Sequence, residues 1–159
     1  MKVRVGFGYD VHQLKEGREM WLGGVQIPSS FGPLGHSDAD VLLHAICDAI
    51  LGAAGLRDIG FYFPDTSADF KNIDSKILLS QTVTLASERG WTIGNIDATL
   101  CLEKPKIKPH VEAMRSAIAE ICHIETDDVS IKATTSEKMG FVGREEGVNA
   151  YAVVLLQKD

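Results

Sequence analysis

The chain has 159 residues, a formal net charge of −6 and a hydrophobic fraction of 45%, which predicts a single globular domain with one core. The acidic balance argues against nucleic acid as a partner, because nucleic-acid-binding surfaces are basic. No apolar run approaches the roughly 20 residues of a transmembrane helix, so no membrane partner is expected, and the first residues lack the apolar core of a signal peptide. Three scattered cysteines without a C-x-x-C pair indicate a reducing, cytoplasmic location; they are Cys47, Cys101 and Cys122.

The first half of the chain predicts a strand, a hairpin and a helix. Alternating apolar residues predict a strand over residues 3–11, and paired glycines predict a hairpin turn within residues 21–28. Residues 29–37 are rich in Ser, Gly and Pro and are expected to form a loop. Apolar residues at helical spacing predict a helix that begins within residues 38–40 and ends near Gly55.

The second half alternates further helices and strands. Residues 57–73 are expected to form a long loop of the kind that often carries function, and two prolines predict a turn over residues 103–109. The order of elements predicts an α+β fold, a single domain over residues 1–159 with a mixed β-sheet and helices packed on one face. The remaining predicted elements are helices at 74–89 and 110–123, and strands at 91–103, 129–135 and 148–157.

The sharpest chemical signal is Asp10-Val11-His12 on the first predicted strand. Residues two apart on a strand point to the same face, so this carboxylate and this imidazole project together. Such a pair supplies two zinc ligands, and catalytic zinc sites combine three protein ligands with one open position. His44, in an apolar stretch of the predicted helix, is the candidate third ligand, although no spacing rule links it to His12. The alternative is a chance D-x-H pair and a hydrogen-bonded core histidine.

Two acidic residues flank His44 at helical spacing. Asp40 and Asp48 stand four residues before and after it, on the same helix face. Either could accept the second ring N–H of His44 and fix its tautomer, as carboxylates near metal-binding histidines do. The alternative is that both are solvated helix residues.

Two further clusters are candidate phosphate sites. His36 and Ser37 precede the predicted helix, where free backbone N–H groups favour an anion; capping by Ser37 or Asp38 is the alternative. Arg144 lies between glycines and suits bidentate phosphate recognition, or else an ion pair with Glu146.

A run of hydroxyl side chains follows the strand predicted at 129–135. Thr134, Thr135 and Ser136 could cradle a phosphate together with backbone N–H groups. Glu137 beside them could hold a divalent cation shared with phosphate oxygens. The alternative is a hydroxyl-stabilised turn with a solvated glutamate.

Taken together and in order, four motifs of this chain resemble those of the 2-C-methyl-D-erythritol 2,4-cyclodiphosphate synthase family. Each motif is weak alone, but all four in register are specific, and the resemblance covers essentially the whole chain. The motifs span residues 8–12, 35–44, 58–60 with 63–66, and 132–141 with 143–144.

The resemblance implies a lyase of the non-mevalonate route to isoprenoids. It would convert 4-diphosphocytidyl-2-C-methyl-D-erythritol 2-phosphate into 2-C-methyl-D-erythritol 2,4-cyclodiphosphate and release CMP. It also implies a homotrimer with active sites between subunits, and suggests an isoprenoid diphosphate on the three-fold axis. The implied metals are Zn²⁺ on Asp10, His12 and His44, and Mg²⁺ or Mn²⁺ near Glu137.

The resemblance further implies roles for individual residues. His36 and Thr135 match residues assigned to transition-state stabilisation. The segment 102–108, together with Thr134 and Thr135, would wrap the cytidine, and residues 58–60 and 63–67 would bind the erythritol part. The implied substrate-binding residues are Ser37, Asp58, Ile59, Gly60, Phe63, Pro64, Asp65, Thr66, Ser67, Leu102, Glu103, Lys104, Pro105, Lys106, Ile107, Lys108, Ala133, Thr134, Ser136, Phe141 and Arg144.

Two rival interpretations start from the same residues. A zinc-dependent phosphohydrolase of a nucleotide diphosphate also needs a D-x-H pair with a further histidine, because such a site can activate water. A metal-stabilised binding module without turnover would need a fourth protein ligand. No further Cys or His stands near Asp10 and His12 in the sequence, which argues against the second of these.

Overall fold

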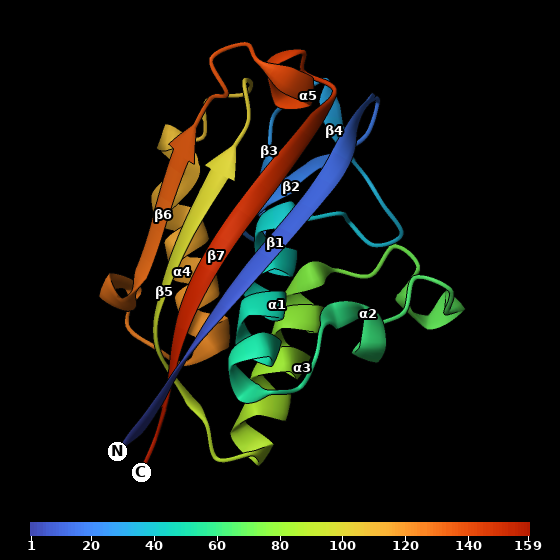
Figure 1. Cartoon of the computed structure of the whole chain (residues 1–159). Helices are drawn as coiled ribbons and strands as arrows, with labels where there is room; N and C mark the ends of the chain where they lie inside the picture. The colour runs from blue at the N-terminus through green and yellow to red at the C-terminus, as the bar shows by residue number, and fades with distance from the viewer.

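Two long antiparallel strands form the centre of the sheet in this computed structural model, which describes residues 1–159. β1 (Lys2–Glu16) pairs with β7 (Gly147–Lys158) along almost their whole lengths (Figure 1). The five-stranded sheet has the order β4-β1-β7-β5-β6, and only β5 and β6 run parallel. The predicted α+β fold with a mixed sheet is therefore confirmed. The other strands are β2 (Met20–Leu22), β3 (Val25–Ile27), β4 (Phe31–Leu34), β5 (Thr92–Cys101) and β6 (Val129–Thr134).

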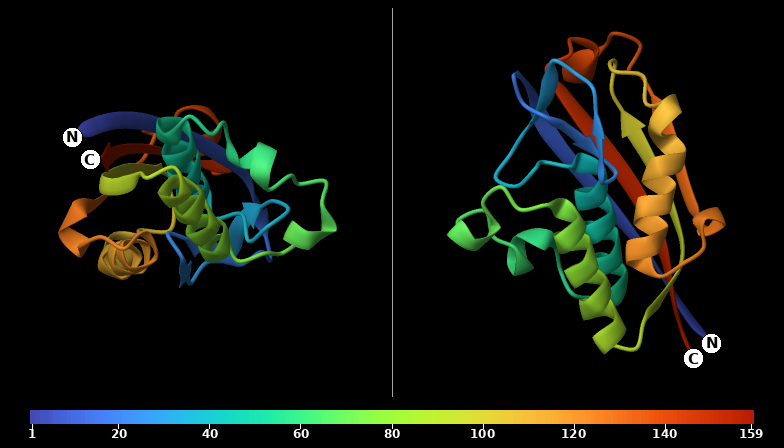
Figure 2. Two further views of the ribbon diagram at one scale, coloured as in Figure 1. Left: turned by 90° about the horizontal axis from the view of Figure 1, so that it is seen from below. Right: turned by 180° about the vertical axis from the view of Figure 1, so that it is seen from behind.

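The three long helices cover one face of this sheet. Figure 2 shows them together in front of the strands when the molecule is seen from behind. No helix is long and apolar enough to cross a bilayer. The helices are α1 (Val41–Ala54), α2 (Ile59–Tyr62), α3 (Ser75–Glu88), α4 (Val111–Cys122) and α5 (Gly140–Gly143), with 3₁₀ turns at Ala68–Phe70, Lys108–His110 and Thr126–Asp128.

Helix α1 is the central helix, and its ends are the ones that the sequence predicts. Asp40 caps its start by accepting the N–H of Leu43 at 3.1 Å. Gly55 ends it in the left-handed conformation, at φ 73°. Nearly every residue of the helix is buried, because it lies between the sheet and α3.

Two glycines let α1 lie directly on β1. A Cβ at Gly6 would come within 1.9 Å of the carbonyl oxygen of Ala49, and one at Gly8 within 1.8 Å of that of Ala45. No side chain fits at either position, so the helix backbone rests against the strand backbone. This close approach brings the first turn of α1 to the end of β1.

The opposite face of the sheet carries apolar side chains with no cover. Phe7 is 63% exposed and Val5 is 67% exposed. Beside them on β7, Val153 and Tyr151 are exposed as well, and the rings of Tyr9 and Tyr151 lie 5.2 Å apart. Figure 1 looks onto this face. An apolar stripe of this kind is typical of a protein–protein interface.

Two segments predicted as loops contain short regular elements. Residues 29–37 include β4, which pairs with the end of β1 at the sheet edge. The prediction of an unbroken loop is wrong there, because an edge strand tolerates Pro33. Residues 57–73 include α2 and a 3₁₀ turn. The other predicted elements are confirmed, with ends that differ by a few residues.

Candidate metal centre and active site

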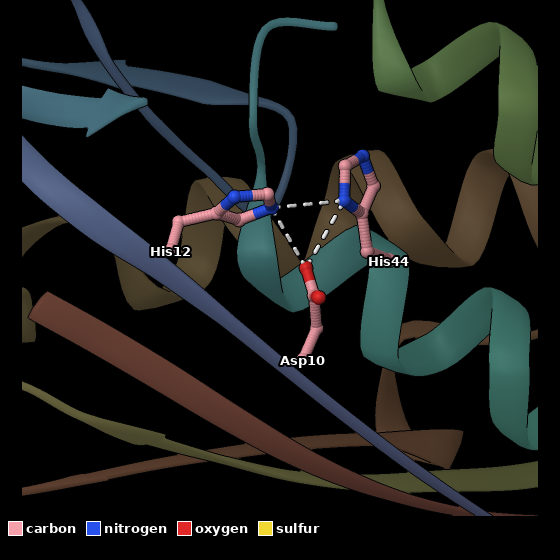
Figure 3. Close-up of side chains that lie close together, drawn as sticks. All are labelled: Asp10, His12 and His44. Carbon is pink, nitrogen blue, oxygen red and sulfur yellow. Dashed lines mark hydrogen bonds and ion pairs between the residues drawn. The ribbon is translucent and has the colours of Figure 1, made fainter. Parts of the chain in front are cut away.

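The three predicted metal ligands converge on one point (Figure 3). Oδ2 of Asp10 lies 2.9 Å from Nε2 of His12 and 3.1 Å from Nδ1 of His44. The two ring nitrogens lie 3.3 Å from each other. These are two nitrogen donors and a carboxylate oxygen, the set that zinc takes readily, and no other His, Cys, Asp or Glu joins them. The residues therefore fit a divalent metal.

The backbone explains why these side chains meet. Asp10 and His12 point from the same side of β1 toward α1, as the strand period requires. Gly8 allows α1 to approach, which carries His44 in its first turn to the same place. Gly35 permits the loop before α1 to pass His12, since a Cβ there would lie 3.1 Å from the His12 ring.

The three residues of the triad shift the pKa values of Asp10 and His44 without a bound metal. Burial works against the charged form of Asp10, but hydrogen bonds and charges from His12 and His44 lower its pKa to about 2. Burial also disfavours a charged His44, yet its hydrogen bond to Asp10 and the charge of that residue raise its pKa. Asp10 is thus an ionised carboxylate that faces two imidazole rings. A metal cation bound between them would take the place of the ring protons as the positive partner of Asp10.

The second ring nitrogen of His44 contacts two hydroxyls. Nε2 lies 2.8 Å from Oγ of Ser75 and 3.2 Å from Oγ of Ser37. The expectation that Asp40 or Asp48 accepts this N–H is therefore wrong. Both carboxylates already accept backbone N–H groups.

The partners of those two carboxylates show why neither reaches the ring. Asp40 accepts from Gly23, Gly24 and Leu43, which ties the hairpin of β2 and β3 to α1. Asp48 accepts from the N–H of Ile59 at 2.8 Å and so fixes the start of α2.

A cavity of about 590 Å³ opens beside the triad. It brings together the metal ligands, the residues before α1 and the predicted erythritol-binding loop. His36 lines it, and its Nε2 contacts the carbonyl oxygen of Ser67 at 2.8 Å. Of the predicted site residues it includes Asp10, His12, His36, Ser37, His44, Ile59, Gly60, Phe63, Pro64, Asp65 and Thr66; the sequence analysis did not single out Gly35, Phe70, Ile73 or Leu78, which also line it.

A second cavity of about 370 Å³ is lined by most of the predicted cytidine-binding residues, though not by Glu103 or Lys104. It lies between the turn after β5, the start of α4 and the end of β6, and it shares no lining residue with the first. Within one chain, His36 and Thr135 therefore lie in different cavities. The second cavity is lined by Leu102, Pro105, Lys106, Ile107, Lys108, Val111, Ile131, Ala133, Thr134 and Thr135.

The remaining predicted residues lie outside the triad cavity. Glu137 is exposed, and its carboxylate accepts the hydroxyl of Thr135 at 3.2 Å. Glu103 accepts the N–H and the hydroxyl of Ser136, which joins the turn after β5 to the turn after β6. These turns form one surface at the ends of two parallel strands.

Three other predicted residues make local contacts. The Arg144 guanidinium forms a bidentate ion pair with Glu146, at 3.0 and 3.1 Å, which is one of the two alternatives for this arginine. Asp58 caps α2 by accepting the N–H of Phe61 at 3.0 Å. Lys104 contacts Glu145 at 3.2 Å on the surface.

Comparison with known proteins shows which family this chain belongs to. The sequence profile of the YgbB family matches residues 3–157, which is nearly the whole chain. The chain belongs to this family. A protein of Bacteroides thetaiotaomicron named 2-C-methyl-D-erythritol 2,4-cyclodiphosphate synthase is 62% identical over 159 residues, covering 100% of both chains. One of the same name from Cytophaga hutchinsonii is 64% identical over 158 residues, covering 99% of each.

Solved structures with the same fold are found as well. The bifunctional IspDF of Campylobacter jejuni matches with a TM-score of 0.96 and 44% identity, over 99% of this chain and 43% of that one. The IspF of Plasmodium falciparum in complex with CDP matches with a TM-score of 0.86 and 34% identity, over 99% and 97% of the two chains. The comparisons give no support to the phosphohydrolase alternative.

Proposed function

We propose that this chain is a 2-C-methyl-D-erythritol 2,4-cyclodiphosphate synthase of the non-mevalonate pathway, a lyase that forms the cyclic diphosphate from 4-diphosphocytidyl-2-C-methyl-D-erythritol 2-phosphate and releases CMP. The observation that carries the proposal is the Asp10–His12–His44 triad at a cavity of about 590 Å³. The full-length identity of 62% to a protein of that name supports the same reaction. The functional unit is the single domain of residues 1–159.

The triad would hold Zn²⁺, and the exposed carboxylate of Glu137 would hold Mg²⁺ or Mn²⁺ with the substrate phosphates. Zinc bound there supplies a Lewis acid for a phosphate oxygen. A chain of net charge −6 needs such cations to accept a polyphosphate.

The protein's own residues act mainly by positioning. Intramolecular phosphoryl transfer needs aligned groups and neutralised charge rather than a protein nucleophile. Holding the two phosphate ends together lowers the barrier by roughly 7–11 kcal/mol. His36 lies in the wall of the triad cavity and Thr135 in that of the second cavity, and there each would stabilise the transition state.

The two cavities suit two parts of the substrate. We assign the cytidine to the cavity of about 370 Å³, whose lining mixes apolar side chains, lysines and threonines. The erythritol phosphate belongs in the triad cavity, against the loop that contains α2. The Plasmodium falciparum relative bound to CDP supports a cytidine diphosphate ligand.

We further propose a homotrimer in which neighbouring subunits bring these two cavities together. The apolar stripe on β1 and β7 supports this assembly, because it is exposed in the single chain. Light scattering should give about three times the 17.3 kDa of one chain. A monomeric mass for active protein would contradict the assembly.

Two finer points of the proposal concern the axis and the compartment. An isoprenoid diphosphate would bind on the three-fold axis near Arg144 and Glu146, and calorimetry with geranyl diphosphate should then show heat. Absence of heat in the trimer would exclude that ligand. We place the enzyme in the cytoplasm, in keeping with three free cysteines.

A product assay tests the central proposal. Purified protein with Mg²⁺ receives the cytidyl-diphosphate substrate, and phosphorus NMR follows the products with and without a zinc chelator. The expected result is equal formation of CMP and the cyclic diphosphate, both abolished by chelation. Release of inorganic phosphate, or no turnover in metal-replete protein, would overturn the proposal.

A further inference from the structure

His44 has two ring nitrogens, and only one of them faces the other metal ligands. In Figure 3 the second nitrogen points away from Asp10 and His12. That nitrogen, Nε2, lies 2.8 Å from Oγ of Ser75 and 3.2 Å from Oγ of Ser37. A neutral ring that is to bind a metal through Nδ1 must carry its proton on Nε2. His44 can therefore be a ligand only if Nε2 donates, rather than accepts, the hydrogen bonds to these hydroxyls.

The hydroxyl proton of Ser75 has a partner of its own. Oγ of Ser75 lies 2.5 Å from Oδ1 of Asp38, and a carboxylate only accepts hydrogen bonds. Both oxygens of Asp38 also accept backbone N–H groups, Oδ2 from Ser75 at 2.9 Å and Oδ1 from Asp40 at 3.0 Å. Asp38 is therefore an acceptor on both oxygens, and the Ser75 proton points to it.

The orientation of the Ser75 hydroxyl then fixes the tautomer of the histidine. With its proton on Asp38, Ser75 presents a lone pair to Nε2 of His44 at 2.8 Å. An unprotonated Nε2 would place two lone pairs in contact, so Nε2 carries the hydrogen and donates it. The longer contact to Oγ of Ser37 is consistent with the Nε2 hydrogen being shared between Ser75 and Ser37. Ser37 Oγ is an acceptor elsewhere as well, since it accepts the N–H of Ala39 at 3.1 Å.

The position of these residues in the fold makes the contact rigid. Ser75 is the first residue of α3 and is fully buried. Asp38 lies in the loop before α1, and its own N–H donates to the carbonyl of Ile73 at 3.1 Å. The ring of His44 is thus held from α3 on one side while β1 presents Asp10 on the other.

We propose that Asp38 and Ser75 form a relay that sets the tautomer and the orientation of His44 for metal binding; this rests on the metal site of the proposed function. Both are positioning residues, because neither contacts the place between Asp10, His12 and His44 where the metal would bind. Loss of such a partner weakens metal binding by about 10- to 100-fold in other proteins. The same relay joins the loop carrying His36 to α3, so the metal site and the substrate cavity share one support.

The test is zinc affinity, measured on full-length protein by competition with a chromophoric chelator. Ser75→Ala should weaken zinc binding at least fivefold, about 10- to 100-fold in the expected range, while Ser75→Thr, which keeps the hydroxyl, should recover most of it. Ser80→Ala is the matched control, because Ser80 is exposed on the same helix. Melting of the metal-free protein separates a loss of stability from a loss of affinity.

An NMR measurement needs no variant. In ¹⁵N-histidine-labelled, zinc-loaded wild-type protein, the His44 Nε2–H should give a one-bond cross-peak protected from solvent exchange, because it is buried and donated. Absence of that cross-peak, or a Ser75→Ala affinity within fivefold of wild type, would overturn the relay. If wild type and His44→Ala bind zinc equally, the metal site of the proposed function fails instead.

Discussion

Replacing Gly8 with alanine tests the link between strand packing and the metal site. A Cβ at this position would lie 1.8 Å from the carbonyl oxygen of Ala45, where ordinary contacts begin at 3.4 Å. The backbones of β1 and α1 would have to separate by about 1.6 Å. Because His44 is on α1 and Asp10 is on β1, the same movement would pull the ligands apart.

The expected magnitudes follow from that displacement. Overpacking of a core costs about 1–3 kcal/mol, and a backbone clash this short should reach about 3 kcal/mol. For a chain of this size the melting temperature should fall by roughly 6–12 °C. Zinc sites tolerate ligand shifts of only about 0.2 Å, so zinc affinity should fall by at least about tenfold.

The assay compares Gly8→Ala with Gly52→Ala. A Cβ at Gly52 meets nothing within 4 Å, and this glycine is exposed on the same helix α1. That control should gain about 0.5–1 kcal/mol of helix stability and keep its zinc affinity. Thermal melting and chelator competition measure both effects. If Gly8→Ala melted and bound zinc like wild type, the reasoning from close packing would be refuted.

Three further predictions use the triad and the apolar face. His44→Ala should keep its circular dichroism spectrum but lose stoichiometric zinc in atomic absorption; retained zinc would exclude His44 as a ligand. The pKa of His44 is raised in the folded, metal-free protein, so its protonated ring stabilises the fold below about pH 6.5. This contribution to the free energy of unfolding is lost as pH rises through the raised pKa. Zinc, in contrast, binds only the neutral ring. The rise in melting temperature on adding zinc should therefore be larger at pH 8 than at pH 6, and an equal rise would contradict this. Phe7→Glu should give monomers in light scattering, and an intact trimer would remove the β1 face from the interface.

The predictions that held are those that depend on local periodicity. The period of two on β1 placed Asp10 and His12 on one face, whatever packs against them. The helix of His44 followed from apolar spacing, with Asp40 and Gly55 at its ends as caps. Each of these depends on neighbours within a few residues, which the sequence displays directly.

The predictions that failed depend on neighbours far along the chain. Asp40 and Asp48 were plausible partners for His44 on helix geometry alone, but backbone N–H groups of the hairpin and of α2 occupy them. The actual partner is Ser75, 31 residues away on another helix. β4 was missed because its pairing with β1 is set at the sheet edge and not by its own four residues.

For this protein, the sequence by itself determined most of the elements, the donor types and, through its four motifs in register, the family. The tertiary structure decided that His44 meets Asp10, because this needs Gly8 to let α1 rest on β1. It also decided that one face of the sheet stays uncovered and that the site residues divide between two cavities. The physical reason is that strand alternation and helix capping depend on residues a few positions apart. Contacts between residues far apart in the sequence depend instead on how closely the elements pack.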